Sequence, residues 1–318
     1  MKRIAVLTSG GDSPGMNAAI RAVVRTCVFN EKECMGVLRG YEGLIDGEYV
    51  PMDRASVGGV LHRGGTILKT ARSERFKTEE GRRTALSKMR DAGIEGLVVI
   101  GGDGSFHGAK LLHDIGMPTI GVPGTIDNDV AGTDETIGFD TAVNTALEAV
   151  MRLRDTASSH DRLFIVEVMG RNAGFLALEV AVATGAEYVV VPELPLSIGN
   201  LCQRLRASHE KKKSHTLIIL AEGVMTANEM KDKLQDTGGY DARVTVLGYI
   251  QRGGSPTSFD TILASRMGAY ATESLFIGKS GVMVGNISGR MTLSDLERSW
   301  SERKSLSPEM LGLVEKLN

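Results

Sequence analysis

The chain has 318 residues, a hydrophobic content of 42% and a formal net charge of −2, which is ordinary for a globular protein and predicts about two domains. The near-zero charge and the aromatic content of 5% argue against nucleic acid and anionic membranes as partners. Three scattered cysteines form neither a disulfide framework nor a zinc motif. The first apolar run, Ile4–Leu7, is too short for a signal peptide and no run reaches a membrane span, so we expect a cytoplasmic protein.

Short apolar runs alternate with longer helix-like stretches along the chain. Ile4–Leu7 predicts a strand, followed by a helix over Met16–Phe29. The later elements that we expect are helices over Thr78–Ala92, Gly104–Ile115, Phe139–Ala157 and Gly174–Thr184, and strands over Leu97–Ile100, Ile120–Val122, Phe164–Val168, Tyr188–Val191 and Leu217–Ala221. This alternation favours an α/β fold with parallel sheets flanked by helices.

The two halves of the chain resemble each other. Ile4–Leu7 leads into the glycine turn Gly11–Gly15 and an alanine-rich helix, and Phe164–Val168 leads into Gly170–Gly174 and another helix. The pattern predicts two βα-built domains with ligand sites at the carboxyl ends of their strands. The alternative is that short α/β segments look alike without any duplication.

The turn Gly11-Asp12-Ser13-Pro14-Gly15 matches the G-x-S-x-G elbow of hydrolases, but the chemistry does not fit. The residue after the nucleophile must donate its N–H to the oxyanion, and Pro14 has no N–H. Pro14 instead suits the first turn of a helix. We therefore interpret the turn as a phosphate cradle, in which Gly10 and Gly11 expose amides at a helix N-terminus.

A second glycine turn ends the apolar run LVVIGGDGS at Leu97–Ser105. Its glycines expose backbone N–H groups, and Asp103 adds a carboxylate that a hydrated Mg²⁺ could approach. A third turn, Gly121–Asp129, carries the hydroxyl of Thr125 and two carboxylates, Asp127 and Asp129. Phosphoryl transfer needs amides, a metal carboxylate and a carboxylate that orients the attacking hydroxyl.

Plainer interpretations exist for parts of this set. Each acid of the third turn, taken alone, is explained by an Asx turn, whereas a functional role is favoured beside Asp103 and Thr125. Arg72, Arg171 and Arg252 lie in or next to glycine-containing loops, where a guanidinium can fork onto phosphate or can simply be a solvated loop charge.

With these motifs the chain resembles the bacterial 6-phosphofructokinases over nearly its whole length. The matching segments are TSGGDSPGMNAAIR at Thr8–Arg21, RGGT at Arg63–Thr66, GGDGS at Gly101–Ser105, PGTIDND at Pro123–Asp129, MGRNAG at Met169–Gly174, and QRGGSP with ILASRMGAYA within Gln251–Ala271. The resemblance implies two Rossmann-like three-layer αβα domains with a cleft between them. It also implies an ATP-binding domain of residues 1–138 plus 256–303 and a sugar-phosphate-binding domain of residues 139–255 plus 304–318.

The implied reaction is the Mg-ATP-dependent phosphorylation of fructose 6-phosphate to fructose 1,6-bisphosphate, the committed step of glycolysis, by a cytoplasmic homotetramer. The resemblance makes Asp127 the base and assigns the catalytic surroundings to Gly11, Arg72, Thr125, Asp129 and Arg171. It places around ATP the residues Gly11, Tyr41, Arg72, Ser73, Gly102, Asp103, Gly104, Ser105 and Gly108, with Asp103 holding magnesium. It places around the sugar phosphate Thr125, Ile126, Asp127, Arg162, Met169, Gly170, Arg171, Glu222, Arg243, Tyr249 and Arg252, with Arg162 and Arg243 reaching in from a neighbouring subunit.

The choice of phosphoryl donor is predicted by two glycines. Pyrophosphate-dependent relatives carry Asp and Lys where this chain has Gly104 and Gly124, and a side chain at position 104 would crowd the α-phosphate of a nucleotide. We therefore expect ATP as the donor. The alternatives are a pyrophosphate-dependent phosphofructokinase and a non-catalytic nucleotide sensor, against which the retained Asp103, Asp127 and Arg171 argue.

The chain departs from the family pattern at three positions. Tyr249 stands where histidine is usual, so one hydrogen-bond donor remains but no titratable positive charge. Lys77 replaces a frequent arginine and loses its fork. Gly59 replaces a frequent acid at the effector site.

An effector site is indicated by Arg21 and Arg25, which lie one turn apart on a helix without acids and repel each other unless an anion binds. The resemblance implies activation by ADP or GDP and inhibition by phosphoenolpyruvate at a subunit interface. The implied residues are Arg21, Arg25, Arg54, Arg154, Gly185, Glu187, Lys211, Lys213 and His215.

Overall fold

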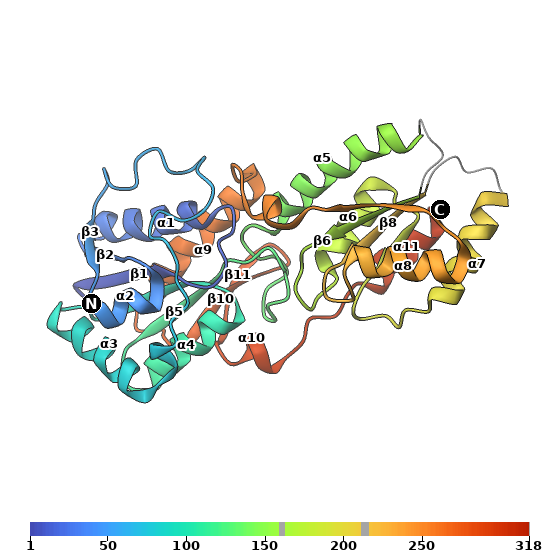
Figure 1. Ribbon diagram of the computed structural model, residues 1–318. Helices are drawn as coiled ribbons and strands as arrows, with labels where there is room; N and C mark the ends of the chain where they lie inside the picture. Colours follow the sequence, from blue (N-terminus) through green and yellow to red (C-terminus); the bar gives the residue numbers. More distant parts are fainter. Residues whose placement is uncertain (159–162, 211–215, 318) are drawn as a thin grey trace. The chain divides into compact units, whose positions relative to one another are not determined.

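The computed structural model describes residues 1–158, 163–210 and 216–317. The chain forms two compact units (Figure 1). Unit 1 comprises Met1–Ile126, Val130–Thr141 and Arg252–Lys304, and unit 2 comprises Asp127–Asp129, Ala142–Gln251 and Ser305–Asn318. The sequence-based division differs from these units in two ways: it placed residues 127–129 in the first domain, and it placed residues 139–141, 252–255 and 304 in the second. The ligand that each unit binds stays a prediction.

In the described part of unit 1 the strands form a seven-stranded sheet in the order β11-β10-β5-β4-β1-β2-β3. The strands are β1 (Arg3–Thr8), β2 (Glu33–Val37), β3 (Tyr49–Met52), β4 (Leu97–Gly101), β5 (Thr119–Pro123), β10 (Val282–Ile287) and β11 (Arg290–Asp295). All neighbours pair in parallel except at the two edges, where β3 and β11 are antiparallel to β2 and β10. The expected parallel sheet is therefore present, with one antiparallel strand added at each edge.

Helices cover both faces of this sheet, as expected for fully buried strands without polar alternation. The helices of unit 1 are α1 (Met16–Phe29), α2 (Gly40–Asp46), η1 (Arg75–Lys77), α3 (Glu79–Asp91), α4 (Asp103–Asp114), α9 (Ser258–Phe276) and α10 (Arg298–Ser301). Side chains alternate along β1: Ile4 and Val6 face the core layer of α1 and α9, and Ala5 and Leu7 face the layer of α3 and α4. This unit is a three-layer αβα sandwich.

Among the described residues of unit 2, four parallel strands lie in the order β7-β8-β6-β9. They are β6 (Leu163–Val168), β7 (Tyr188–Val190), β8 (Thr216–Ala221) and β9 (Ala242–Val246). The helices are α5 (Phe139–Ser158), which begins in unit 1, α6 (Phe175–Thr184), α7 (Ile198–Glu210), α8 (Ala227–Gly238), η2 (Gly248–Arg252) and α11 (Pro308–Lys316). The side chain of Thr226 and that of Glu229 form a capping box that starts α8.

The predicted α/β fold is confirmed, and each expected helix and strand is present with ends that differ by one residue. The sequence interpretation missed β2, α2, β3, η1 and α7, together with every element after residue 222. Pro14 lies in the turn before α1 and not in its first turn, since Gly15 is the N-cap. The strand connections also limit the idea of a duplication: α1 leads to the strand next to β1, whereas α6 leads to the edge strand β7. No helix in the described residues is long and apolar enough to cross a membrane.

Gly121 on β5 tests how tightly the α4 layer is packed. A Cβ at this position would lie 2.7 Å from the Phe106 ring and 3.0 Å from Leu296, and both side chains are fully buried. We expect Gly121→Ala to lower the free energy of unfolding by about 1–3 kcal/mol through overpacking. Gly312→Ala is the control, because no atom lies near its Cβ position inside α11 and helix propensity should stabilise it by about 0.5–1 kcal/mol. Urea unfolding curves measure both, and equal midpoints would contradict this account.

Candidate active site

Two glycine turns meet at the carboxyl edge of the unit 1 sheet, because β1 and β4 are neighbours there. The N–H of Ser9 donates to the carbonyl of Ile100 over 2.9 Å. A Cβ on Gly101 would lie 2.5 Å from both the Ser9 carbonyl oxygen and Ser105 Oγ, and one on Gly10 would lie 3.3 Å from Ser105 Oγ. Side chains are therefore excluded where the two backbones approach.

The second turn runs directly into the N-terminus of α4. Its N-cap is Gly102, and no side chain caps the helix. The positive end of the helix dipole is therefore open to an anion. Asp103 is half-buried, and its Oδ1 accepts the Gly104 N–H over 2.6 Å. No protein atom lies within 4 Å of a Cβ built on Gly104, so space remains beside the helix start.

The third turn follows β5 and touches the same edge. Gly124 N–H donates to the Gly101 carbonyl over 3.0 Å, and Thr136 Oγ1 donates to the Thr125 carbonyl over 2.7 Å. The Cβ of Thr125 lies 3.8 Å from the Cβ position of Gly102, so unit 1 brings this predicted hydroxyl to the second turn. Ile126 is buried at 2% exposure.

Asp127 and Asp129 lie on either side of a strained residue. Asn128 has a φ of 52° and is buried at 7% exposure, and non-glycine residues adopt this left-handed conformation only where the surroundings hold it. Both carboxylates are half-buried and belong to unit 2 by their contacts. The third turn therefore presents two acids on either side of the buried Asn128.

Arg252 groups with unit 1 and lies at the first turn. Its guanidinium occupies the space that a Cβ on Gly11 would need. The segment around it is tied to the loop of Gly64: Ser255 Oγ donates to the His62 carbonyl over 2.7 Å, and a Cβ on Gly64 would lie 2.5 Å from the Gly254 carbonyl oxygen. The predicted sugar-phosphate role of Arg252 is not tested by this contact.

Tyr41 supports α4 from within the core. Its hydroxyl donates to the Ser105 carbonyl, its ring stacks on Phe76 at a centroid distance of 4.1 Å, and it fills the space at Gly108. The side chain is 6% exposed, and burial raises the pKa of its hydroxyl. Among the residues predicted for ATP, Tyr41 and Gly108 therefore make a packed contact with each other.

The neighbouring loop holds the other two residues predicted for ATP. Arg72 is exposed, and Ser73 Oγ accepts the Phe76 N–H over 3.1 Å. Sequence reasoning missed Phe76, whose only signal is one aromatic residue in a charged loop. It also missed Asn17, a buried polar residue on α1 that accepts from Ile67 N over 2.8 Å and donates to the Arg63 carbonyl over 2.9 Å.

In unit 2 the predicted residues gather at the ends of β6 and β8, which pair in parallel. Arg171 has a φ of 57° and donates its N–H to Glu222 Oε1 over 2.8 Å. Gly223 has no room for a Cβ because the Arg171 carbonyl lies there. Gly170 has a φ of 134°, and Met169 is 9% exposed. The carboxylate of Glu222 thus fixes the turn that presents the Arg171 side chain.

The remaining residues predicted for the sugar phosphate are exposed or undescribed. Arg243 forms an ion pair with Asp241 at 3.2 Å, and its side chain is 48% exposed. Tyr249 is 80% exposed on η2. Arg162 lies outside the described residues.

The predicted effector residues fall into two groups. In unit 1, Arg25 Nη2 donates to the Arg54 carbonyl over 3.1 Å, its Nε is buried without a hydrogen-bond partner, and Arg21 is half-buried one turn earlier. Gly59 has a φ of 65° with no atom near its Cβ position. This conformation favours glycine, which gives a physical reason for the missing acid.

In unit 2, Arg154 Nη2 donates to the Gly185 carbonyl over 2.7 Å and lies 3.8 Å from Glu187 Oε1. Glu187 Oε2 accepts the Leu217 N–H over 2.8 Å. The fold brings these three predicted effector residues together. Lys211, Lys213 and His215 lie outside the described residues.

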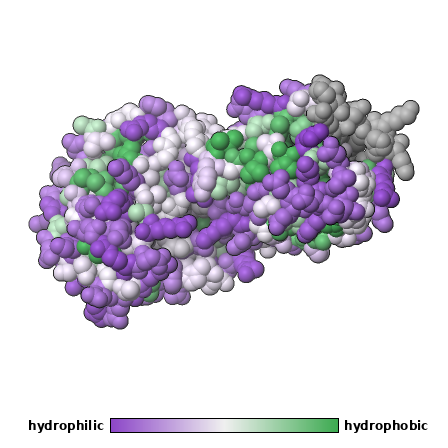
Figure 2. Space-filling view, viewed as in Figure 1, coloured by the Kyte–Doolittle hydropathy of each residue, from purple (hydrophilic) through white to green (hydrophobic). Residues whose placement is uncertain are grey.

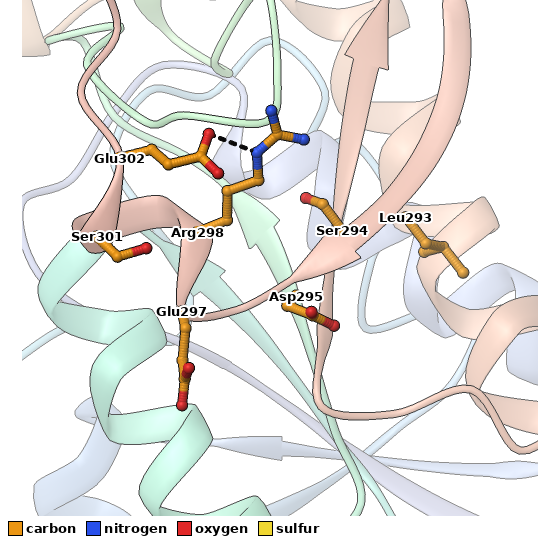
Figure 3. Close-up of a pocket in the computed structure, with 7 residues that line it drawn as sticks. All are labelled: Leu293, Ser294, Asp295, Glu297, Arg298, Ser301 and Glu302. Carbon is orange, nitrogen blue, oxygen red and sulfur yellow. Dashed lines mark hydrogen bonds and ion pairs between the residues drawn. The ribbon is translucent and has the colours of Figure 1, made fainter.

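A hollow of about 510 Å³ lies elsewhere in unit 1, at the end of β11 and beside α10 (Figure 3). In it Arg298 Nε donates to Glu302 Oε2 over 2.7 Å. None of the residues that line it belongs to the predicted set; they are Leu293, Ser294, Asp295, Glu297, Arg298, Ser301 and Glu302. Within the described residues no group of three or more His, Cys, Asp or Glu side chains could hold a metal ion.

The strand ends of the two α/β units carry glycine turns, carboxylates and arginines, the groups that an enzyme of phosphoryl transfer needs. Comparison with known proteins identifies the family. The family model described as "Phosphofructokinase" matches residues 3–275, so the chain belongs to the phosphofructokinase family. It is therefore a kinase that transfers phosphate to an alcohol.

Individual relatives agree with this assignment. The chain is 52% identical over 318 residues to "ATP-dependent 6-phosphofructokinase" of Halalkalibacterium halodurans, with 100% of each chain covered. It is 54% identical over 320 residues to "ATP-dependent 6-phosphofructokinase 1" of Thermus thermophilus, with 100% of this chain and 99% of the relative covered. The solved structure of phosphofructokinase from Saccharomyces cerevisiae matches with a TM-score of 0.89 at 35% identity, and this chain spans 50% of that chain.

Proposed function

We propose that this protein is an ATP-dependent 6-phosphofructokinase that transfers the γ-phosphoryl group of ATP to the 1-hydroxyl of fructose 6-phosphate. The observation that carries the proposal is the identity of 52% to a bacterial enzyme of that name over the full length of both chains. The reaction belongs to glycolysis, and we place it in the cytoplasm.

The donor phosphates bind at the carboxyl edge of the unit 1 sheet. Gly11 and the amides at the start of α4 hold the phosphate oxygens, and the helix dipole favours their negative charge. Arg72 and Ser73 lie in the exposed loop that completes the nucleotide site, while Tyr41 and Gly108 support α4. Support comes from the excluded side chains at Gly10 and Gly101 and from the open space at Gly104.

Magnesium enters as part of the Mg-ATP substrate. The described residues offer no cage of three protein ligands, which fits an ion that keeps its waters and binds phosphates plus one carboxylate. Asp103 would hold it, because this carboxylate is half-buried at the helix start beside the glycines. The ion neutralises phosphate charge during transfer.

The acceptor hydroxyl is oriented by Asp127, which takes its proton as the hydroxyl oxygen bonds to the γ-phosphorus, while the bond from that phosphorus to the bridging oxygen breaks and ADP leaves. Asp129 assists through water, and Thr125 and Arg171 stabilise the charge on the moving group. The left-handed backbones at Asn128 and Arg171 support these roles, because such conformations concentrate where a side chain must be held in one place.

The sugar phosphate is bound by residues of this chain and of a neighbouring subunit in a homotetramer. Charged and hydrogen-bonding groups recognise its phosphate and hydroxyls. The third glycine turn and the turn of Arg171 add backbone and apolar contacts. We assign this role to Ile126, Arg162, Met169, Gly170, Glu222, Arg243, Tyr249 and Arg252. The exposure of Arg243 supports its contribution across a subunit interface.

Exposed apolar side chains support the proposed homotetramer. Unit 2 exposes Met151, Val246 and Ile250, and unit 1 exposes Phe259 and Ile262, each by 44% or more. Apolar surface gathers on the face shown in Figure 2 among largely hydrophilic surface. Contiguous apolar patches on a folded chain mark contact surfaces between proteins.

The base role of Asp127 is tested by Asp127→Ser. We expect the turnover rate with Mg-ATP and fructose 6-phosphate to fall by about 10²–10⁴-fold, because the acceptor hydroxyl loses its proton acceptor. Equilibrium binding of fructose 6-phosphate should stay close to that of the unchanged protein. A coupled assay and calorimetric titration measure the two quantities, and an active variant would refute the role.

The donor preference is tested by Gly104→Asp. The Cβ position is open, so the variant should fold with an unfolding free energy within about 0.5 kcal/mol of the unchanged protein. Activity with Mg-ATP should be lost, since the new carboxylate enters the space that we assign to the nucleotide. The matched control is Gly199→Asp, also the second residue of a helix with an open Cβ position. Assays of all three proteins with Mg-ATP and with pyrophosphate decide the matter, and a preference for pyrophosphate in the unchanged protein would reverse the assignment.

We also propose regulation by ADP or GDP as activators and phosphoenolpyruvate as an inhibitor. The buried Nε of Arg25 without a hydrogen-bond partner supports an anion site at Arg21, Arg25 and Arg54. The pairing of Arg154 with Gly185 and Glu187 supports a second group of ligands, which Lys211, Lys213 and His215 would complete.

Arg25→Ala tests the effector site. We expect the response to ADP and to phosphoenolpyruvate to weaken by about ten-fold in effector concentration, the loss of one charged hydrogen bond. The rate at saturating substrates should stay within about two-fold, because Arg25 lies near the C-terminal end of α1, away from the glycine turn Gly11–Gly15 that precedes this helix. Titration of each effector against the initial rate measures this, and a collapse of the saturated rate would argue against an effector role.

A further inference from the structure

Asp260 is a fully buried carboxylate that none of the assignments above uses. It is 0% exposed in the first turn of α9, and burial together with the nearby charge of Asp140 raises its pKa. Burying a carboxylate lowers the stability of the fold unless the carboxylate is hydrogen-bonded. Its hydrogen-bond partners therefore identify the segment that Asp260 fixes in place.

Those partners all belong to one segment of unit 1. Asp260 Oδ1 accepts the Gly138 N–H over 2.8 Å, and Oδ2 accepts both the Thr141 N–H over 2.8 Å and the Thr141 hydroxyl over 2.6 Å. The segment is the first turn of α5 and the residue before it. Asp260 therefore caps a helix other than its own.

This segment backs the first glycine turn. Ser13 Oγ donates to the Ile137 carbonyl over 2.9 Å, and a Cβ on Gly138 would lie 2.5 Å from that of Ser13. The Cβ position of Gly15 lies 2.7 Å from Ile137 and 3.6 Å from Asp260 Cβ. The turn thus rests on the residues that Asp260 holds.

The third turn and the segment of Arg252 rest on the same residues. Ile137 N–H donates to the Pro123 carbonyl over 3.0 Å, just before Thr125. Thr257, the N-cap of α9, accepts the Asp260 N–H, donates its hydroxyl to Asp140 over 2.5 Å and donates its N–H to Thr141 Oγ1 over 3.0 Å. It ends the short segment that places Arg252 at Gly11.

We propose that Asp260 is a positioning residue for phosphoryl transfer, whose carboxylate holds the Gly11 turn, the Thr125 turn and the Arg252 segment in register. The inference rests on the function proposed above. Asp260 touches neither substrate; its loss leaves two buried N–H groups without an acceptor and lets the three elements shift independently. Small displacements of this kind lower the rate of a phosphoryl transfer that depends on alignment.

The test compares variants of two residues. Asp260→Asn keeps the shape but turns an NH₂ group toward an N–H donor. We expect kcat to fall about ten-fold or more and the KM for fructose 6-phosphate to rise about two-fold or more, because the displaced segment carries Arg252. Thr141→Val removes the hydroxyl from the same cluster and should lower kcat about three-fold or more, whereas Thr141→Ser keeps the hydroxyl and should restore it.

Thr272→Val is the matched control, because this buried threonine on the same helix donates only within α9, to the Gly268 carbonyl over 2.8 Å. Thermal unfolding identifies folded variants, and if Asp260→Asn does not fold, the Thr141 pair decides. A folded Asp260→Asn with unchanged kcat, or an equal loss in Thr272→Val, overturns the positioning role. An unchanged protein without activity on fructose 6-phosphate and Mg-ATP would instead refute the proposed function, and this role with it.

Discussion

The close approach of the β1 and β4 ends is the constraint on which the candidate site depends. The two strands pair in parallel with Thr8 opposite Ile100, so both chains leave the sheet at one level. A Cβ on Gly101 would lie 2.5 Å from the Ser9 carbonyl oxygen, and only glycine allows this separation. Backbone N–H groups, which bind phosphate without long side chains, are thereby concentrated at the start of α4.

Around this edge the structure relies on buried polar groups rather than on apolar packing alone. Asn17 holds the loop of Gly64, and Asp260 holds the start of α5. A buried hydrogen-bonded group fixes direction as well as distance, whereas apolar contacts tolerate sliding. This difference accounts for polar side chains in the core of a protein whose reaction depends on alignment.

Periodicity predicted the strands and helices that are long, apolar and bounded by glycine. It missed β9, whose sequence ARVTV mixes charge into a strand, and the antiparallel edges β3 and β11. β3 and β11 each pair with the strand just before them in the chain, but their sequences, YVPM and RMTLSD, contain no apolar run of the kind that predicted the central strands. The suggested duplication of the two halves is also limited, because α6 leads to the edge strand β7 and not to a neighbour of β6.

The sequence by itself determined the chemistry of the three turns, because glycine, carboxylate and hydroxyl groups within a few residues need only local backbone to act together. It also determined the family, through motifs in a fixed order. Only the tertiary structure decided that Arg252 lies at Gly11, that Tyr41 is buried against Gly108, and that Asp260 caps a helix more than a hundred residues away. Such contacts join residues distant in the chain, and the packing of whole elements brings them together.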